Sequence, residues 1–391
     1  MNVPEHPRFG LDEYRERTGR LRAALRELEI DVLLVTSPAN LFWLTDYEAS
    51  WYPPRLPVGV AVWAHEERTL FFDWSRHEEF LPYDALYDEA EFFDYGTAHI
   101  TVAEQLARRS PGARVALEWS SPTPVPGVMV PLGEELSARG MSVSAGDWIV
   151  DGLRVYKSPA ERERVLAAGA IADRVFRRLH ETLRPGLSEL EVAALVTTFM
   201  SEEGGEVPAQ HPLVASGPSA WRDVHSFPSR RVLEPGDIVS VDASAVVDRY
   251  HVNLCRVFSL GRAHPGVSQL LDAARESLDV LCANAHPGDD PAIAMARAEQ
   301  ALRDRVPAEK VWWTGGYALG VSFPPSWVGH TYLANDGPHR ITLEEGYLSN
   351  FESILRDRVE HFEAAAIDTV LMTDEGLRPL STIPRELLIA G

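Results

Sequence analysis

The chain has 391 residues, 45% of them apolar and 24% charged, a composition that excludes a largely disordered protein and favours two domains. Because 37 basic residues stand against 58 acidic ones, the formal charge is −21, which disfavours nucleic acid as a partner and anionic membranes as a docking surface. Two cysteines, Cys255 and Cys282, exclude a disulfide framework and a cysteine-based zinc site.

The cytoplasm is the location that the sequence predicts. No run approaches the roughly 20 apolar residues that a bilayer-spanning helix needs. The first residues contain no apolar stretch of the kind that a secretory signal carries, and two cysteines fit a reducing compartment.

Residues 1–155 predict an α/β domain. Asp12 is expected to cap a helix with one apolar stripe, formed by Tyr14, Leu21, Leu25 and Leu28. Apolar runs bounded by turn residues predict strands at residues 30–35, 58–63, 70–73 and 115–118.

Two helix starts open a second predicted domain, residues 156–391. Ser158 and Glu161 form a capping box with Pro159 at the first helical position, which predicts a helix to about residue 183. Ser188 and Glu191 form a second capping box, which predicts a helix to about residue 203. Beyond them we predict a hairpin of strands 238–246 and 250–260, a helical region at 267–305, and strands at 317–323, 346–354 and 366–372.

Candidate chemistry lies on the later strands. Period-two geometry places His251, Asn253 and Cys255 on one face of their strand. Asp242 and Glu352 each interrupt an apolar run, where a carboxylate is costly unless it has a partner. Both carboxylates could be structural residues bonded to the backbone or facing solvent, or they could form a functional site.

Five short motifs occur in a characteristic order: Lys157-Ser158-Pro159-Ala160-Glu161, Arg184-Pro185-Gly186-Leu187-Ser188-Glu189, Ser216-Gly217-Pro218, Glu234-Pro235-Gly236-Asp237 and Val241-Asp242-Ala243. Together they make the whole chain resemble the pita-bread family of methionine aminopeptidase, aminopeptidase P, prolidase and creatinase. The resemblance implies an α/β (α+β) fold in two parts. A creatinase-type N-terminal domain, residues 1–155, would precede a pita-bread catalytic domain, residues 156–391.

The resemblance also implies which residues would hold metal. Peptidases of the family bind two metal ions with two Asp, one His and two Glu, and the five matching positions here are Asp242, Asn253, Tyr317, Glu352 and Ile367. Isoleucine cannot coordinate, and neutral Asn and Tyr are weak ligands for a hard dication. Glu363 could substitute only if the strand register slips. We therefore expect no metal and no other cofactor.

Creatinase and ectoine hydrolase are similar metal-free members, and the second of them is matched by residues 316–320, 323–327, 330–331 and 379–385. In that branch His225 corresponds to the histidine that carries protons, and His330 to a second family histidine. Either could instead be an ordinary surface residue. Cys255 replaces a carboxylate that clamps guanidinium in creatinase, and is predicted to be a buried thiol more readily than a nucleophile.

The expected pocket combines catalytic His225, Asp242, Glu352 and His330 with substrate-binding Tyr317, His251, Asn253 and Cys255. In dimers of the family, a loop of the N-terminal domain reaches the neighbouring active site. Trp51, Tyr52 and Arg55 are the candidates for this role, although the same segment could be a plain surface loop. We expect a homodimer that binds a small-molecule substrate.

The resemblance implies metal-independent hydrolysis of a C–N bond in a small amidine, guanidine or cyclic amino-acid-like metabolite. Three alternatives stay open: a metal-dependent Xaa-Pro peptidase, a repurposed biosynthetic enzyme, and a non-catalytic pita-bread protein.

Overall fold

The computed structural model describes residues 1–48, 53–221, 225, 227–337 and 339–391. The chain divides into two compact units, Met1–Arg154 and Val155–Gly391. Within the described ranges, no helix is both long enough and apolar enough to cross a membrane.

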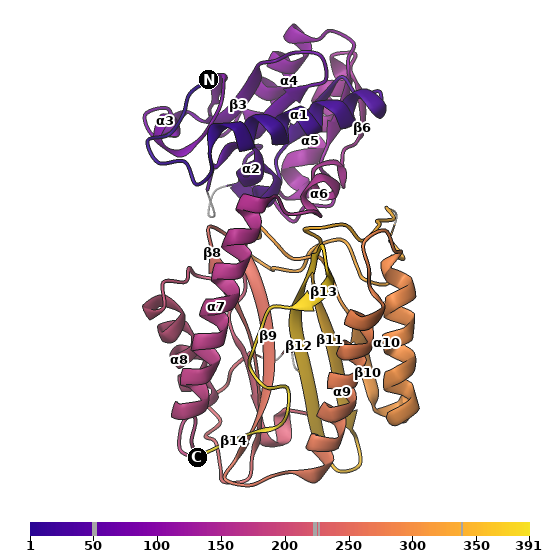
Figure 1. The fold of residues 1–391 in the computed structure, drawn as a ribbon. Coiled ribbons are helices and arrows are strands. Elements are labelled where there is room, and N and C mark those ends of the chain that lie inside the picture. The colour runs from indigo at the N-terminus through magenta and orange to yellow at the C-terminus, as the bar shows by residue number, and fades with distance from the viewer. Residues whose placement is uncertain (49–52, 222–224, 226, 338) are drawn as a thin grey trace. The chain divides into compact units, whose positions relative to one another are not determined.

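The N-terminal unit is a mixed sheet with helices (Figure 1). Its strand order is β4-β3-β2-β1-β5-β6, with β1 antiparallel to β2 and parallel to β5. The strands are β1 (Val32–Val35), β2 (Gly59–Trp63), β3 (Thr69–Trp74), β4 (Glu89–Phe93), β5 (Arg114–Leu117) and β6 (Ser142–Ala145). The helices are α1 (Leu11–Glu27), α2 (Pro38–Thr45), α3 (Leu81–Asp84), α4 (Ala98–Arg109), α5 (Pro126–Ala138) and α6 (Ile149–Arg154).

Two details of the predicted first helix are wrong. Gly10 occupies the N-cap position, while Asp12 lies in the first turn and accepts a hydrogen bond from Arg15 at 3.0 Å. Leu28 follows the end of α1 and is 55% exposed, because the helix has ended before the apolar stripe reaches it.

The C-terminal unit is built on one large sheet of order β10-β11-β12-β9-β8-β7, with β13 on β12 and β14 on β9. Its strands are β7 (Leu213–Ser216), β8 (Ile238–Val247), β9 (Tyr250–Leu260), β10 (Val311–Gly315), β11 (Leu348–Asp357), β12 (Phe362–Thr373), β13 (Gly376–Pro379) and β14 (Leu388–Ala390). Its helices are α7 (Pro159–Thr182), α8 (Glu189–Glu202), α9 (Pro265–Asn284) and α10 (Pro291–Arg305). The capping boxes predicted at Ser158 and Ser188 are both present.

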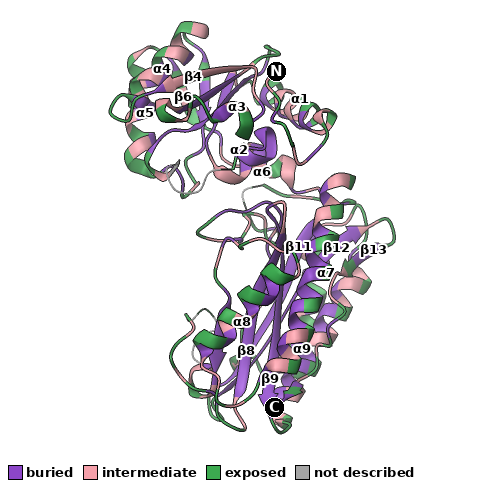
Figure 2. Cartoon of the chain, turned by 90° about the vertical axis from the view of Figure 1, so that its left-hand side faces the viewer, coloured by how far each residue is buried: buried purple, intermediate pink, exposed green. Residues whose placement is uncertain are grey.

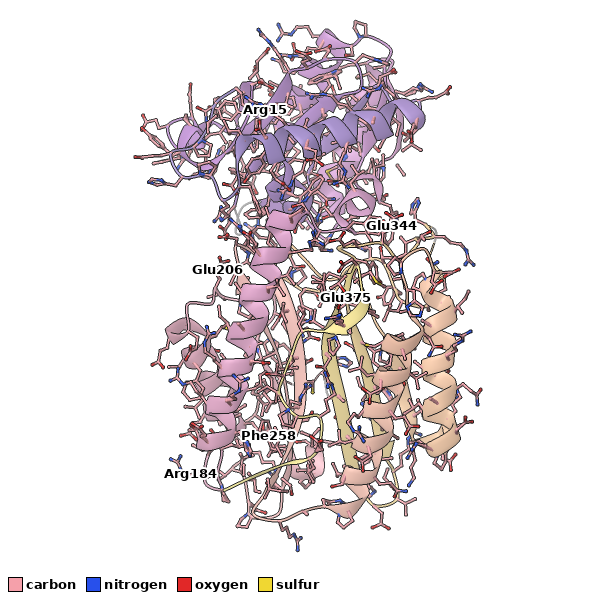
Figure 3. The ribbon with its side chains drawn as sticks, viewed as in Figure 1. Arg15, Arg184, Glu206, Phe258, Glu344 and Glu375 are labelled. Atoms are coloured by element: carbon pink, nitrogen blue, oxygen red, sulfur yellow. The ribbon has the colours of Figure 1, made fainter. Side chains whose placement is uncertain are left out.

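The predicted hairpin is β8 and β9, joined by Asp248 and Arg249. Both turn residues have positive φ, 47° and 65°, as a two-residue turn between twisted strands requires. Glu206, labelled in Figure 3, accepts from the backbone N–H of Asp248 at 2.7 Å and of Arg249 at 3.1 Å. This carboxylate therefore fixes the turn, and with it the register of the two strands.

Two other predicted elements differ from the structure. The helical region at 267–305 is two helices, because Pro287 and Gly288, whose φ is 93°, break it between α9 and α10. The predicted strand at 317–323 contributes only isolated bridges, such as Tyr317 to Tyr332. The edge strand is instead β10, which the sequence reasoning missed.

Helices α7 and α9 lie on the same side of the sheet in Figure 1. Glu161 of α7 accepts a hydrogen bond from Tyr250, and His180 of α7 packs on Phe258, both even-numbered residues of β9. Leu278 and Leu281 of α9 pack in a cluster with Phe351 and other residues of the same face. The strands between are buried along their length (Figure 2), so the odd-numbered face of β9 remains for the site.

Candidate functional site

Four residues stand opposite one another in a row across the C-terminal sheet. Asp242 on β8 pairs with Cys255 on β9, Cys255 with Ile367 on β12, and Ile367 with Glu352 on β11. Directly opposed residues of antiparallel strands project to the same face. The row thus gathers three positions matched to metal ligands, with Cys255 between them.

Two side-chain amides connect the carboxyl groups at the ends of this row. Asn253 donates through Nδ2 to Oδ1 of Asp242 at 2.6 Å. Asn350 donates through Nδ2 to Oε1 of Glu352 at 2.6 Å and to Oδ1 of Asn253 at 3.3 Å. We call the chain Asp242–Asn253–Asn350–Glu352 the carboxyl–amide network.

The backbone of Tyr317 fixes the orientation of both amides. Its N–H donates to Oδ1 of Asn350 at 2.8 Å. Because a backbone N–H can only donate, Asn350 must turn its oxygen to Tyr317 and its NH₂ to Glu352 and Asn253. Asn253 then accepts with its oxygen and turns its own NH₂ to Asp242, so each carboxyl group faces an amide donor.

The pKa of each carboxyl group is raised above its ordinary value. Burial, and then the nearby charge of Glu352, raise the pKa of Asp242 to about 7, against the bond from Asn253. Burial raises the pKa of Glu352 to about 7, against bonds from Tyr317, Asn350 and Trp313. Because the charge of Glu352 disfavours ionisation of Asp242, we expect the pair to retain about one proton near pH 7.

Two aromatic side chains, Tyr317 and Trp327, lie at the Glu352 end of the network. Trp327 donates from Nε1 to the hydroxyl of Tyr317 at 3.3 Å, and the Tyr317 hydroxyl bonds to Glu352. Burial, followed by the charges of both carboxyl groups, holds the pKa of Tyr317 well above its usual range. Tyr317 is therefore a neutral phenol that can donate to Glu352.

The donor set does not fit the dinuclear metal centre that the family resemblance implies. Ile367 has no donor atom, Asn253 turns N–H groups toward Asp242, and Tyr317 keeps its proton. Among the residues that the structure describes, no three or more His, Cys, Asp and Glu side chains are grouped as a metal site would require. Two carboxyl groups alone cannot hold two dications.

Glu363 does not replace the missing ligand. The register between β11 and β12 runs without a slip, with Glu363 opposite Arg356 and Ile367 opposite Glu352. Arg356 Nε lies 3.2 Å from the Glu363 carboxylate in a buried ion pair. Glu363 thus pairs with Arg356, four residues along the strand from Ile367.

The structure describes one aromatic contact of His225 and the exposure of His330. The ring of His225 lies beside Trp312, with 5.5 Å between ring centroids. Three of its neighbours in the sequence, residues 224, 223 and 226, are outside the described ranges. His330 is exposed, two residues before Tyr332, whose ring meets Tyr317 edge-on.

His251 and Cys255 are buried among structural contacts. Nε2 of His251 accepts from the backbone N–H of Ala209 at 2.9 Å, and Nδ1 lies 2.8 Å from the carbonyl of Arg249. Burial, and then Arg249, lower the pKa of His251 to about 3, so both nitrogens of a neutral ring are occupied and none is left for substrate. Burial, and then Asp242, hold the pKa of the Cys255 thiol well above its usual range, as expected of a structural cysteine rather than a nucleophile.

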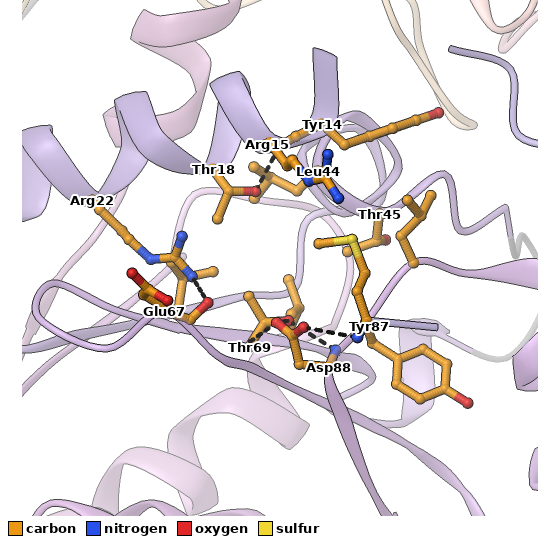
Figure 4. Close-up of a pocket in the computed structure, with 14 residues that line it drawn as sticks. Tyr14, Arg15, Thr18, Arg22, Leu44, Thr45, Glu67, Thr69, Tyr87 and Asp88 are labelled. Atoms are coloured by element: carbon orange, nitrogen blue, oxygen red, sulfur yellow. Dashed lines mark hydrogen bonds and ion pairs between the residues drawn. The ribbon is translucent and has the colours of Figure 1, made fainter. Parts of the chain in front are cut away.

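The role expected of the N-terminal candidates stays a prediction. Trp51 and Tyr52 lie outside the described residues, and Arg55 is exposed in a 3₁₀ turn, Pro53–Arg55. A cavity of about 340 Å³ in this unit is lined by Arg15 and Arg22 of α1 and by Asp88 (Figure 4). Asp88 accepts from the backbone N–H of Thr69, and Arg22 donates to the backbone carbonyl of Glu67.

Three contributors were missed by the sequence reasoning: Asn350, Trp327 and Trp313. Asn350 could have been found, because it lies two residues before Glu352 and must share its face. Trp327 comes from the Pro-Pro-Ser-Trp segment of a loop, and Trp313 from the unpredicted strand β10. No periodicity could have placed either of them.

Comparisons with known proteins agree on both halves of the chain. The model of metallopeptidase family M24 matches residues 163–374, and that of the creatinase/prolidase N-terminal domain matches residues 17–130. Ectoine hydrolase from Halomonas elongata is 25% identical over 97% of this chain and 98% of its own. The Xaa-Pro dipeptidase of Pyrococcus furiosus is 26% identical over 62% of this chain and 67% of its own.

Solved structures share the fold. Recombinant prolidase from Thermococcus sibiricus matches 97% of this chain and 100% of its own with a TM-score of 0.85, at 21% identity. This likeness confirms the predicted fold class, an α/β creatinase-type N-terminal domain followed by a pita-bread domain.

Proposed function

The chain belongs to metallopeptidase family M24, whose model matches residues 163–374, and from this premise we propose that it is a hydrolase that cleaves a C–N bond without metal ions. Its substrate is a small amidine, guanidine or cyclic amino-acid-like metabolite. The observation that carries the proposal is the carboxyl–amide network, in which amide NH₂ groups face both carboxyl groups where the peptidases of the family use cations.

The network supports binding of a monocation. A pair of carboxyl groups that keeps one proton carries about one negative charge, which matches an amidinium or guanidinium group. N–H donors of such a group bond well to carboxylate oxygens. Cys255 stands at the position where creatinase has a carboxylate that holds the guanidinium group of creatine. Creatine is therefore not the expected substrate.

Hydrolysis then needs one base and one acid, and the pair supplies both. The ionised carboxylate takes a proton from a water molecule while the oxygen of that water bonds to the amidine carbon. The protonated carboxyl group gives its proton to the departing nitrogen as the C–N bond breaks. The pair ends with the same number of protons, and a pKa near 7 suits both roles at neutral pH.

His225 is a second candidate proton carrier, on its match to the creatinase histidine. The proposed homodimer stays a prediction, because Trp51 and Tyr52 lie outside the described residues. The runner-up function is a metal-dependent Xaa-Pro peptidase, favoured by the likeness to the Pyrococcus furiosus dipeptidase.

A substrate panel separates the two functions. We expect turnover of cyclic amidines such as ectoine, or of small guanidines, at a rate that EDTA does not change, and no appreciable cleavage of Xaa-Pro dipeptides. The reason is that peptide hydrolysis in this family uses metal-activated water, and free water has a pKa near 15.7. Release of amine or amino acid can be followed by chromatography. Rapid, chelator-sensitive cleavage of Xaa-Pro dipeptides would favour the runner-up.

A further inference from the structure

Trp313 lies next to Glu352 on the edge strand of the sheet. Gly315 pairs directly with Glu352, and Trp313 pairs with Ile354, two residues further along the same strand. Trp313 and Gly315 therefore lie on the same face of the sheet as Glu352. A Cβ atom added at Gly315 would lie 2.6 Å from Cζ2 of Trp313. The indole therefore lies over Gly315, and the absence of a side chain there lets it reach toward Glu352.

Trp313 combines contact with Glu352 and access to solvent. It shares a face of the sheet with Glu352, whose pKa its indole helps to lower, yet 38% of the residue is exposed. Its ring is thus positioned beside the proposed cation-binding carboxylate, at a point that a ligand entering from solvent can reach.

The preceding residue, Trp312, is a natural contrast. It is 41% exposed, but the Arg356 guanidinium lies over its ring at 4.3 Å from the centroid. Among the described residues no cationic side chain lies over the ring of Trp313. The two adjacent tryptophans are similarly exposed, but a cation of the protein lies over the ring of Trp312, whereas Trp313 lies beside Glu352.

We propose that Trp313 is a further substrate-binding residue, whose ring and the Glu352 carboxylate together hold the planar cation of the substrate. The inference rests on the proposed function and names the recognised class more closely, an amidinium or guanidinium rather than a neutral amide. A planar cation can present N–H groups to the carboxylate and lie against an indole ring at the same time. Neutral molecules of the same shape lack the positive charge that strengthens both interactions.

Calorimetric titration with benzamidine hydrochloride, and with neutral benzamide as its isostere, tests the inference. Wild-type protein should bind benzamidine and not measurably bind benzamide. Trp313→Ala should weaken benzamidine binding about five- to thirtyfold, the range of a partly desolvated cation–π contact, and Trp313→Phe should keep most of the affinity. Trp312→Ala, the matched control, should change it less than about twofold.

Gly315→Ala provides a second test that leaves both indoles in the chain. The added methyl group should displace the Trp313 ring and weaken benzamidine binding as Trp313→Ala does. Wild-type affinity in folded Trp313→Ala, an equal loss in Trp312→Ala, or no benzamidine binding to the wild type would each overturn the inference. These are binding measurements, so a failure of the proposed hydrolysis would show separately, as bound ligand without turnover.

Discussion

Replacing Glu352 by Gln should reduce kcat about 10²–10⁴-fold, the usual share of a general acid–base group. The amide keeps the shape of the side chain and can still meet Asn350, but it can neither hold nor release the proton that the pair exchanges. Substrate affinity should fall less than kcat, because Asp242 still carries a charge.

The pH dependence of kcat/KM should also change in Glu352→Gln. Because one carboxyl group must be ionised and the other protonated, wild-type kcat/KM should follow a bell around pH 7. The charge of Glu352 helps to raise the pKa of Asp242, so its removal in Glu352→Gln should lower that pKa and move the remaining titration to lower pH.

Glu363→Gln is the matched control for this variant. Glu363 is another buried glutamate of the same sheet, and it forms an ion pair with Arg356. Steady-state rates from pH 5 to 9, with circular dichroism to establish folding, give the answer. A folded Glu352→Gln enzyme with wild-type kcat, or an equal loss in folded Glu363→Gln, would contradict the acid–base role.

The second large effect concerns stability. Asp368→Asn should lower the free energy of unfolding by about 3–5 kcal/mol, because it leaves the buried Arg256 without its counter-charge. Arg256 and Asp368 are each about 1% exposed in their side chains, with 3.0 Å between Nη2 and Oδ1. The same guanidinium also donates to the carbonyls of Cys255 and Ile367, directly behind the row of site residues.

Guanidinium chloride unfolding measures the loss, and Asp279→Asn is its control. Asp279 pairs with Arg275 on the surface of α9, where such pairs contribute about 0–1 kcal/mol. A change below about 1 kcal/mol in Asp368→Asn would mean that the buried pair does not hold the sheet as described.

Much of the fold was predictable because its signals are local. A capping box needs only residues three apart in the chain, and both predicted boxes, at Ser158 and Ser188, are present. Strand alternation correctly placed Asn253 and Cys255 on one face of β9. The predicted strand at 317–323 failed for the opposite reason: its apolar residues pack in a loop, and apolar character alone does not distinguish a loop from a strand.

The sequence predicted which residues form the site better than it predicted the hydrogen bonds between them. Asp242, Asn253, Tyr317 and Glu352 were identified by motif, and the structure joins them through hydrogen bonds. The sequence could not reveal that Asn350 links them, because its contact with Asn253 depends on the pairing of β11, β12 and β9. Nor could it show that His251 has backbone partners on both nitrogens.

A carboxyl–amide network that works without metal leaves the protein free of bound metal ions, which elemental analysis measures. The protein is incubated with excess Mn²⁺, Co²⁺ and Zn²⁺, desalted, and measured for bound metal and for turnover before and after EDTA. We expect well below about one metal ion per chain and unchanged turnover, since Asn253, Tyr317 and Ile367 do not complete a dinuclear centre. About two ions per chain, with turnover lost to EDTA and restored by metal, would contradict this expectation.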